Sequence, residues 1–320
     1  MRRVTLADIA KACGVSVNTV SHALHDKPDI SEQTKARIKQ TAEEMGYIQN
    51  ASASFLRSGV SKTIAIIVGD ISNPHFSIII KAMEATVRQH GYTCFVLNTD
   101  ENEKLEHDAI IAAISKNVDG ILICPCQKSD RNVEFLIRSK IPFVLFGRKY
   151  DHLDTNYVVC DDVHSGYLAA DYIIKSGCKK VAVINAGLHI SSSQERLRGI
   201  ENYYQEQGLK LDSDDIYTLP IDQFDHSVAL KNILQRNYDG AICFNDIIAL
   251  ELLACADKPI QVVSFDNIRS KFIFPYLFAC VSSSKIKMSQ EAALGLIRSI
   301  NGDGNVTKMI LPVSPPEIQK

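Results

Sequence analysis

The sequence predicts a small all-α helix-turn-helix head, then a hinge helix, and then an α/β core of two doubly wound parallel-sheet subdomains. Three observations lead to this fold class. Two short amphipathic helices meet at a glycine near the N-terminus, and from residue 63 onward short apolar runs alternate with amphipathic helices. With 320 residues the chain is also long for one domain. Such an alternation is typical of parallel sheets covered by helices.

The head begins with residues 5–24. Thr5 is placed to cap a first helix, with Asp8 at the spacing of a capping box, and Gly14 permits a positive φ in the turn. Ser16 is placed to cap a second helix, whose inner face is apolar. The outer face of that helix groups side chains at i and i+4 spacing, namely Val17, Asn18, Ser21 and His22. This pattern is typical of a helix-turn-helix that enters the DNA major groove, although an ordinary helical hairpin shares it.

A third helix is expected after Ser31, with Ile38, Ala42 and Met45 on its inner face and Gly46 at its end. The charge of this region differs from that of the remainder. Eight basic and six acidic side chains give residues 1–60 a formal charge of +2, while 27 basic and 31 acidic side chains give the rest −4. The sign is the one that a DNA-binding head requires.

Residues 5–21 contain the dense motif T-L-x-D-I-A-x-x-x-G-V-S-x-x-T-V-S. It resembles the N-terminal signature of the lactose-repressor (LacI/GalR) family of bacterial transcription regulators. The resemblance implies that Thr5, Ser16 and the outer face of the second helix contact operator DNA. The family usually has Arg at the position of His22. An imidazole cannot make the bidentate hydrogen bonds that Arg makes to guanine O6 and N7. We therefore expect a different half-site, with weaker base discrimination at the base pair that His22 faces.

Residues 50–59 start with a possible cap, Asn50, and end with Gly59. A helix this short is unstable alone in water, so a flexible linker is one interpretation. The resemblance implies instead a hinge helix that forms on binding and lies in the minor groove, with Asn50, Ala53 and Leu56 against the DNA. Leu56 then takes the position of an apolar wedge between base steps. Gln49 stands where the family often has Pro.

Apolar runs after residue 63 are expected to form buried strands, and amphipathic stretches between them to form helices. The expected strands are 64–68, 94–97, 121–124, 143–146, 158–160, 181–184, 241–244 and 262–265. The expected helices include 76–90, 104–116, 164–175, 195–207 and 227–235. So many strands suggest two subdomains, and the resemblance specifies the type I periplasmic-binding-protein fold.

The expected boundaries follow from these elements. The helix-turn-helix domain spans 1–48, the hinge 49–60, and the effector-binding and dimerisation core 61–320. Within the core, the first subdomain covers about 62–160 and 285–320, including a returning helix at 286–300, and the second covers about 161–284. Ser314-Pro315-Pro316 should stop the last strand early, because Pro cannot donate to a ladder. No leucine heptads follow Leu311, so we expect a homodimer rather than a tetramer.

In open α/β sheets, ligands bind beyond the carboxyl ends of the strands. The candidate site residues are therefore the polar ones at those ends, namely Asp70, Ser72, Asn73, Arg148, Asp161, Asp162, Arg196, Asn245, Asp246, Asp266 and Asn267. The alternative is that these side chains only cap the helices that follow. For Ser72, Asn73 and Asp162 the two interpretations weigh equally.

The resemblance selects the effector-binding residues from this set. Arg196 begins the family's R-x-x-G, whose Arg reaches the effector, and Asp266 lies in its G-[FY]-D-[DN], whose Asp accepts from ligand hydroxyls or amines. Phe76 and Phe224 stand at positions of aromatic or apolar walls, which suit a sugar ring or a purine. With Asp70, Arg148 and Asn245 these residues form the expected effector site. Gly147 and Ser264 depart from the usual Asp and Gly.

Three classes of protein are compatible with an α/β core of this kind: a ligand-responsive transcription regulator, a periplasmic solute-binding protein and an enzyme. The chain has no G-x-S-x-G, P-loop, G-x-G-x-x-G or H-E-x-x-H motif, and no secretory signal or apolar run long enough for a membrane. Its nine cysteines include Cys124-Pro125-Cys126, which lacks zinc-ligand spacing, so no metal or cofactor is expected.

We therefore predict a cytoplasmic regulator that represses transcription, binds near-palindromic double-stranded DNA and does not act as an enzyme. Its partner in the core is expected to be a sugar-like small molecule. Control by a phosphorylated carrier protein as corepressor is the alternative.

Overall fold

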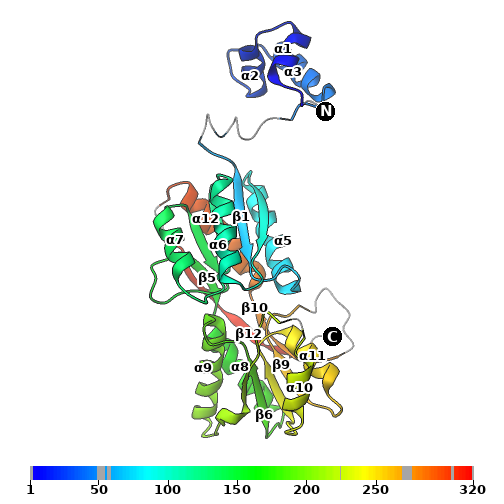
Figure 1. Cartoon of the computed structure of the whole chain (residues 1–320), viewed down its shortest axis with the longest axis vertical. Helices are drawn as coiled ribbons and strands as arrows, with labels where there is room; N and C mark the ends of the chain where they lie inside the picture. Colours follow the sequence, from blue (N-terminus) through cyan, green and yellow to red (C-terminus); the bar gives the residue numbers. More distant parts are fainter. Residues whose placement is uncertain are drawn as a thin grey trace. The chain divides into compact units, whose positions relative to one another are not determined.

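The computed structural model describes residues 3–48, 55, 59–223, 225–268, 276–303 and 306–318. It divides into two compact units, a head (Met1–Ser61) and a core (Lys62–Lys320), shown in Figure 1. Asn50, Ala53, Leu56 and Phe224, predicted as contact residues, lie outside the described part of the chain.

The head is a three-helix unit formed by α1 (Leu6–Cys13), α2 (Val17–Leu24) and α3 (Glu32–Glu44). Local capping explains each start: Thr5 and Asp8 form a reciprocal capping box, and the Ser16 and Ser31 hydroxyls accept from the amides of the residues three positions on. Gly14 has a φ of 65°, which allows the tight turn between α1 and α2. The small core contains Ile9, Ala10, Val20, Ala23, Ile38 and Ala42.

The first subdomain of the core is a parallel sheet with the strand order β11-β5-β4-β3-β1-β2. Its strands are β1 (Thr63–Val68), β2 (Thr93–Asn98), β3 (Gly120–Ile123), β4 (Phe143–Phe146), β5 (Tyr157–Cys160) and β11 (Lys308–Leu311). The helices α5 (Pro74–Gln89) and α12 (Lys285–Ile300) cover one face, and α6 (Glu103–Ser115) and α7 (Arg131–Ser139) cover the other.

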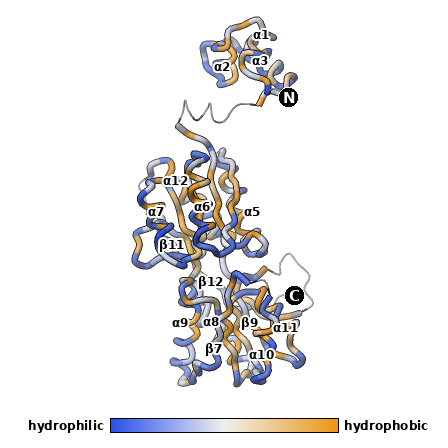
Figure 2. The backbone as a smooth tube through the Cα atoms, in the orientation of Figure 1, coloured by the Kyte–Doolittle hydropathy of each residue, from blue (hydrophilic) through white to orange (hydrophobic). Residues whose placement is uncertain are grey.

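Strand β1 shows why its sequence is a continuous apolar run. Ile64, Ile66 and Val68 pack with α5 and α12, while Ala65 and Ile67 pack with α6 and α7. A strand buried on both faces has no polar alternation. Figure 2 shows the central strands as apolar segments in the interior of the core.

The second subdomain repeats this plan with the strand order β12-β10-β9-β8-β6-β7. Its strands are β6 (Val181–Asn185), β7 (Ile216–Thr218), β8 (Gly240–Cys243), β9 (Gln261–Ser264), β10 (Ala279–Ser283) and β12 (Val313–Ile318). The helices α8 (Asp162–Lys175) and α9 (Ser191–Glu206) cover one face, and α10 (Ser227–Leu234) and α11 (Asp246–Cys255) cover the other. A 3-10 turn, η1 (Ser213–Asp215), precedes β7.

The predicted ending of the chain is wrong in two respects. We expected the last strand to stop before Pro315 and Pro316, but β12 continues through both. It is antiparallel to β10 at the edge of the second sheet, and the register shifts between Cys280 and Ser282. An edge strand with a bulge tolerates residues that cannot donate to a ladder. Residues 313–318 therefore belong to the second subdomain, whereas we had assigned 285–320 to the first.

Helix α12 does return to the first subdomain, where it packs against α5. Within the described ranges, no helix is both long and apolar enough to cross a membrane. The same part of the chain contains no group of three or more His, Cys, Asp or Glu side chains placed to hold a metal ion.

Candidate effector cleft and DNA-binding surface

A cleft lies between the two subdomains of the core, at the carboxyl ends of their strands. It encloses about 640 Å³ of space, including space open to solvent. From the first subdomain it is lined by Asp70, Asn73, His75, Phe76, Glu101 and Arg148, and from the second by Ser192, Arg196, Ile221, Phe244, Asn245 and Asp266. The structure thus brings together every described residue of the predicted effector set, from segments far apart in the sequence.

Arg148 is held by a buried ion pair with Glu101. Its Nη1 donates to Glu101 Oε2 at 2.7 Å and to the Pro125 carbonyl at 2.8 Å, and its Nη2 donates to Glu101 Oε1 at 2.8 Å. Burial lowers the pKa of Arg148, but the charge of Glu101 outweighs this effect and the pKa lies above its ordinary value. This fork fixes the guanidinium at the wall of the cleft.

Arg196 is fixed on the opposite wall by three kinds of contact. Its Nε donates to Asp162 Oδ1 at 2.7 Å and its Nη1 to the Phe244 carbonyl at 2.8 Å. The guanidinium also lies 4.9 Å from the ring centroid of Phe244 and 4.4 Å from that of Phe265. Within the described part of the chain Nη2 makes no hydrogen bond, and Arg196 lines the cleft.

Two glycines bring α8 and α9 close enough for the Arg196–Asp162 bond. A Cβ on Gly199 would collide with the carbonyl oxygen of Val163, and a Cβ on Gly166 would collide with that of Arg196. The glycine of R-x-x-G is therefore needed for helix packing, and the arginine three residues earlier points from that contact into the cleft.

Two carboxyl groups near the cleft are held in buried surroundings. Burial raises the pKa of Asp162 to about 6, even though Arg196 opposes the shift. Burial, with the charge of Asp266 next, likewise raises the pKa of Asp246 to about 6. Asp246 accepts from the Ser264 hydroxyl at 2.5 Å and from the Ile268 amide at 2.8 Å, so the departure at Ser264 provides a hydrogen bond that Gly cannot.

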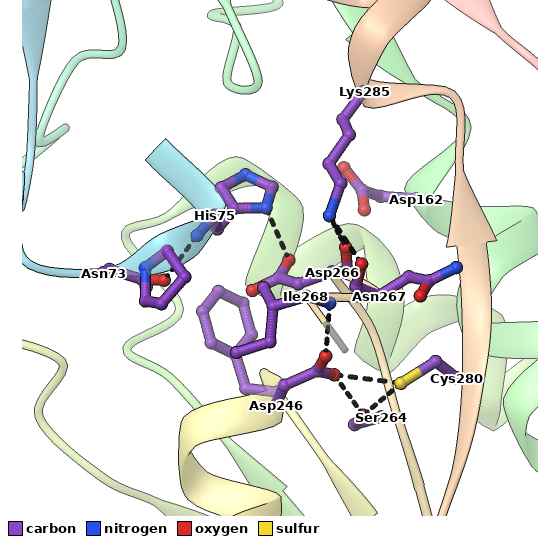
Figure 3. Close-up of polar contacts among 12 residues, drawn as sticks. Asn73, His75, Asp162, Asp246, Ser264, Asp266, Asn267, Ile268, Cys280 and Lys285 are labelled. Carbon is purple, nitrogen blue, oxygen red and sulfur yellow. Dashed lines mark hydrogen bonds and ion pairs between the residues drawn. The ribbon is translucent and has the colours of Figure 1, made fainter. Parts of the chain in front are cut away.

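Asp266 lies at the centre of the close-up in Figure 3. Asp266 and Asn267 both have left-handed backbones, with φ of 78° and 50°. Lys285 Nζ donates to the carbonyl oxygens of both residues, at 2.8 Å for Asn267. Burial lowers the pKa of Lys285, and the nearby acidic side chains, Asp266 first, oppose this shift. This cation stabilises an otherwise strained turn and so fixes the direction of the Asp266 carboxylate.

His75 approaches Asp266 from the other subdomain. Its Nδ1 lies 3.3 Å from Asp266 Oδ1, but it has no hydrogen-bond partner of good geometry among the described residues. Burial, opposed by Asp266, lowers the pKa of His75 to about 4, so the ring is neutral near pH 7. A neutral imidazole and a carboxylate therefore face each other across the cleft.

Other polar contacts also join the two subdomains beside the cleft. Lys149 Nζ lies 2.9 Å from Glu195 Oε1, and Lys128 Nζ lies 3.2 Å from Asp222 Oδ2. The Ser191 amide donates to the Gln127 side chain at 2.8 Å. These contacts hold the subdomains at one relative angle, and a ligand that favours another angle must break them.

Several of the predicted site residues cap the helices that follow the strands, as the alternative interpretation of their positions proposed. Asn73, Asp161 and Asn245 accept from the amides of His75, His164 and Ile248. Asn73 and Asn245 line the cleft as well, so capping and ligand contact do not exclude each other. The Asp70 carboxylate accepts from the Ser72 amide at 2.8 Å and from its hydroxyl at 2.6 Å.

The residues that line the cleft but were not predicted include His75, Glu101, Ser192, Ile221 and Phe244. Lys285, which bonds to the Asp266 and Asn267 carbonyls, was not predicted either. His75 follows the capping Asn73 and could have been noted from its position. Glu101 follows β2 closely, but nothing local indicates that it pairs with Arg148, 47 residues away. Lys285 begins α12 and would be read as an ordinary surface lysine.

In the head, the outer face of α2 is accessible. Val17 is 47% exposed and Asn18 is exposed, while Ser21 and His22 are partly buried. His22 Nδ1 lies 2.6 Å from Asp29 Oδ2. The Thr5 and Ser16 side chains cap α1 and α2, so both lie at helix N-termini, where backbone amides favour anions such as phosphate.

Both the head and the core match models of known protein families. The model of the family "Bacterial regulatory proteins, lacI family" matches residues 5–50, and the model "Periplasmic binding proteins and sugar binding domain of LacI family" matches residues 61–310. The HTH-type transcriptional repressor PurR of Pasteurella multocida (strain Pm70) is 26% identical, over 93% of this chain and 92% of its own. The HTH-type transcriptional regulator DegA of Bacillus subtilis (strain 168) is 27% identical, over 99% and 96%.

Solved structures show the same fold. A crystal structure of the lac repressor dimer bound to operator and the anti-inducer ONPF matches with a TM-score of 0.84 at 19% identity, over 99% of this chain and 98% of that chain. A complex of the transcriptional regulator CelR with cellobiose matches with a TM-score of 0.70 at 20% identity, over 99% of both chains. The second family model alone spans most of the chain, and the first accounts for the head, which a solute-binding protein would not need. The chain therefore belongs to the LacI family of bacterial regulatory proteins: it is a DNA-binding transcription regulator with an effector-binding core, not an enzyme.

Proposed function

We propose that the protein is a cytoplasmic homodimeric repressor whose affinity for a near-palindromic operator is set by a sugar-like effector in the cleft. The observation that supports this most is the convergence of fixed donors and acceptors on one space from both subdomains. Arg196 and Asp266 come from the second subdomain, and Asp70 and the Arg148–Glu101 pair from the first.

The chemistry of the lining favours a polyhydroxylated ligand. Fixed carboxylates accept from hydroxyl groups and a guanidinium donates to them, so vicinal hydroxyls can satisfy both. Phe76 and Phe244 add apolar walls for the flat face of a ring. Two relatives with similar folds were solved with cellobiose and with D-xylulofuranose. The same apolar walls also suit a purine, which is the second ligand class to test.

The regulatory mechanism follows from the position of the cleft between the two subdomains. The effector contacts both subdomains, so its binding energy depends on their relative angle, and the cross-cleft contacts of His75, Lys128 and Lys149 depend on the same angle. A ligand shifts the equilibrium only by its differential affinity for the two arrangements. We propose that one arrangement favours paired hinge helices in the operator and the other disfavours them.

At the DNA, we propose that the outer face of α2 lies in the major groove. Val17 would contact a thymine methyl, Asn18 an adenine or a phosphate, and His22 a base edge. The N-termini capped by Thr5 and Ser16 would lie against the backbone. Asn50, Ala53 and Leu56 of the hinge would then contact the central minor groove.

A thermal-shift screen of sugars, sugar phosphates and nucleobases on the full chain tests the ligand class, because a ligand of the folded state raises the midpoint by mass action. The variant Asp266→Asn keeps the size of the side chain and removes its charge. Asp154→Asn is the matched control, since Asp154 forms an exposed pair with Lys308. We expect Asp266→Asn to lose the shift and Asp154→Asn to keep it. A ligand that still stabilises Asp266→Asn fully would refute the assignment of the cleft.

A further inference from the structure

The contact between His22 and Asp29 sets the chemistry of the recognition helix. His22 lies on the outer face of α2, and Asp29 lies beyond the end of that helix, before α3. His22 Nδ1 and Asp29 Oδ2 are 2.6 Å apart, a short distance typical of a bond to a charged acceptor. The side chains of His22 and Asp29 are 33% and 55% exposed.

The identity of the acceptor decides where the imidazole carries its proton. An ionised carboxylate can only accept, so the hydrogen of this bond is on Nδ1 of His22. The hydrogen bond to His22 lowers the pKa of Asp29, which keeps Asp29 ionised near pH 7. A neutral His22 therefore has no hydrogen on Nε2, and the nitrogen left for DNA is an acceptor.

We propose that Asp29 is a specificity-determining residue of this regulator: by holding the proton of His22 on Nδ1, it makes Nε2 an acceptor that selects adenine or cytosine as the base that His22 directly faces. In the major groove those bases offer the exocyclic donors N6–H₂ and N4–H₂. Guanine offers only the acceptors N7 and O6 there and would leave Nε2 without a donor. The inference rests on the proposed role of His22 in reading a base.

Other charged and titratable side chains near the pair have contacts of their own. His25 Nδ1 lies 2.6 Å from the backbone carbonyl of Ser21, and the charge of Lys27 contributes to the lowered pKa of Asp29. Lys39 is paired with Asp26 at 2.5 Å. Asp26 is thus a second acid on the same connection between α2 and α3, paired with a lysine instead of the histidine. It provides a matched control of equal charge.

Removal of the Asp29 carboxylate should affect DNA binding differently from a variant that damages the fold of the head. Asp29→Ala removes a negative charge next to the DNA, so overall affinity should rise or stay level. It also frees His22 to place its proton on Nε2, where it can donate to guanine. One net hydrogen bond corresponds to about a three- to tenfold change in base preference. We therefore expect better or equal binding together with poorer discrimination.

Two measurements on the full chain test the inference at about pH 8, where an ordinary histidine is neutral. Selection from random DNA gives the base preference of wild type, Asp29→Ala, His22→Ala and the control Asp26→Asn. Two-bond proton–nitrogen correlation spectra of the imidazoles give the tautomer of His22, which is assigned by comparison with His22→Ala. Thermal melting shows that each variant is folded.

We expect the Nδ1–H tautomer and an adenine or cytosine preference in the wild type and in Asp26→Asn. In Asp29→Ala we expect a larger population of the Nε2–H tautomer. The base preference at this position should become weaker or change to guanine. An Nε2–H tautomer in the wild type refutes the inference without any variant. If His22→Ala alters the half-site and Asp29→Ala does not, Asp29 has no such role while His22 still reads DNA. If His22→Ala changes nothing, base reading by His22 fails and the inference fails with it.

Discussion

Replacement of Arg196 by Met tests whether the buried charges of the cleft are coupled as the structure indicates. Methionine keeps an apolar side chain between Phe244 and Phe265, but it leaves Asp162 without its cation. Removing one partner of a buried pair costs about 3–5 kcal/mol, because the other charge stays buried and unpaired. We expect a loss of this size in the free energy of unfolding at about pH 8.

The pH dependence of this loss has a definite sign. The pKa of Asp162 is already raised from 3.8 to about 6 by burial. A folded-state pKa above the unfolded value means that the folded state binds the proton more tightly, so this carboxyl reduces stability as the pH rises. Without Arg196 that pKa rises further, and each additional unit adds about 1.4 kcal/mol to the loss above the new pKa. The difference between wild type and Arg196→Met should therefore be small at about pH 4 and large at about pH 8.

Urea unfolding followed by far-ultraviolet circular dichroism measures this difference, since the chain has no Trp. The double variant Arg196→Met/Asp162→Asn removes the unpaired charge and should recover at least half of the lost stability, with no extra pH dependence. It should still fail to respond to the effector, because the guanidinium is missing. An equal loss at both pH values, or no recovery in the double variant, would show that the Arg196–Asp162 pair is not the cause.

Three further predictions concern packing, the hinge and assembly. Gly199→Ala should destabilise the core by about 1–3 kcal/mol in the same unfolding assay, because its Cβ meets the backbone carbonyl of Val163; an unchanged stability would contradict the close packing of α8 and α9. Leu56→Ala should weaken operator binding several-fold in an anisotropy titration and leave core unfolding unchanged, because a kinked base step loses its apolar filler; equal operator affinity would remove the wedge. Sedimentation equilibrium should show a dimer, and a monomer or tetramer would contradict the proposed assembly.

The parts of the fold that the sequence predicted are those determined by local signals. Thr5, Ser16 and Ser31 each cap a helix through the amide three residues on, so the head could be read from spacing alone. The eight expected strands were all found. Seven of them are buried on both faces and appear as continuous apolar runs, whereas β2 is a partly buried edge strand. The sequence did not predict β7, β10 and β11, and it predicted too early an end for the last strand, because β12 continues through two prolines.

The cleft was only partly predictable, for a related reason. Residues at the ends of strands could be recognised because topology brings strand ends together. Their partners could not: Glu101 reaches Arg148 from 47 residues away, and Lys285 reaches the carbonyl of Asp266 from 19 residues away. The Glu101–Arg148 contact depends on the strand order within the first sheet, and the Lys285–Asp266 contact depends on the packing of the two subdomains, so no local spacing encodes either of them.

The proposed mechanism links ligand binding in the cleft to operator binding through one conformational equilibrium. The direct test is to measure the affinity of the best ligand from the thermal-shift screen with and without saturating operator, and the affinity of operator with and without saturating ligand. Linkage requires that both ratios be the same factor, on the order of 5–150-fold for typical coupling energies. We expect the two affinity ratios to be equal and to lie in that range for the wild type. In Asp266→Asn we expect the ligand to have no effect on operator affinity. A ligand that binds the cleft while operator leaves its affinity unchanged would contradict the account.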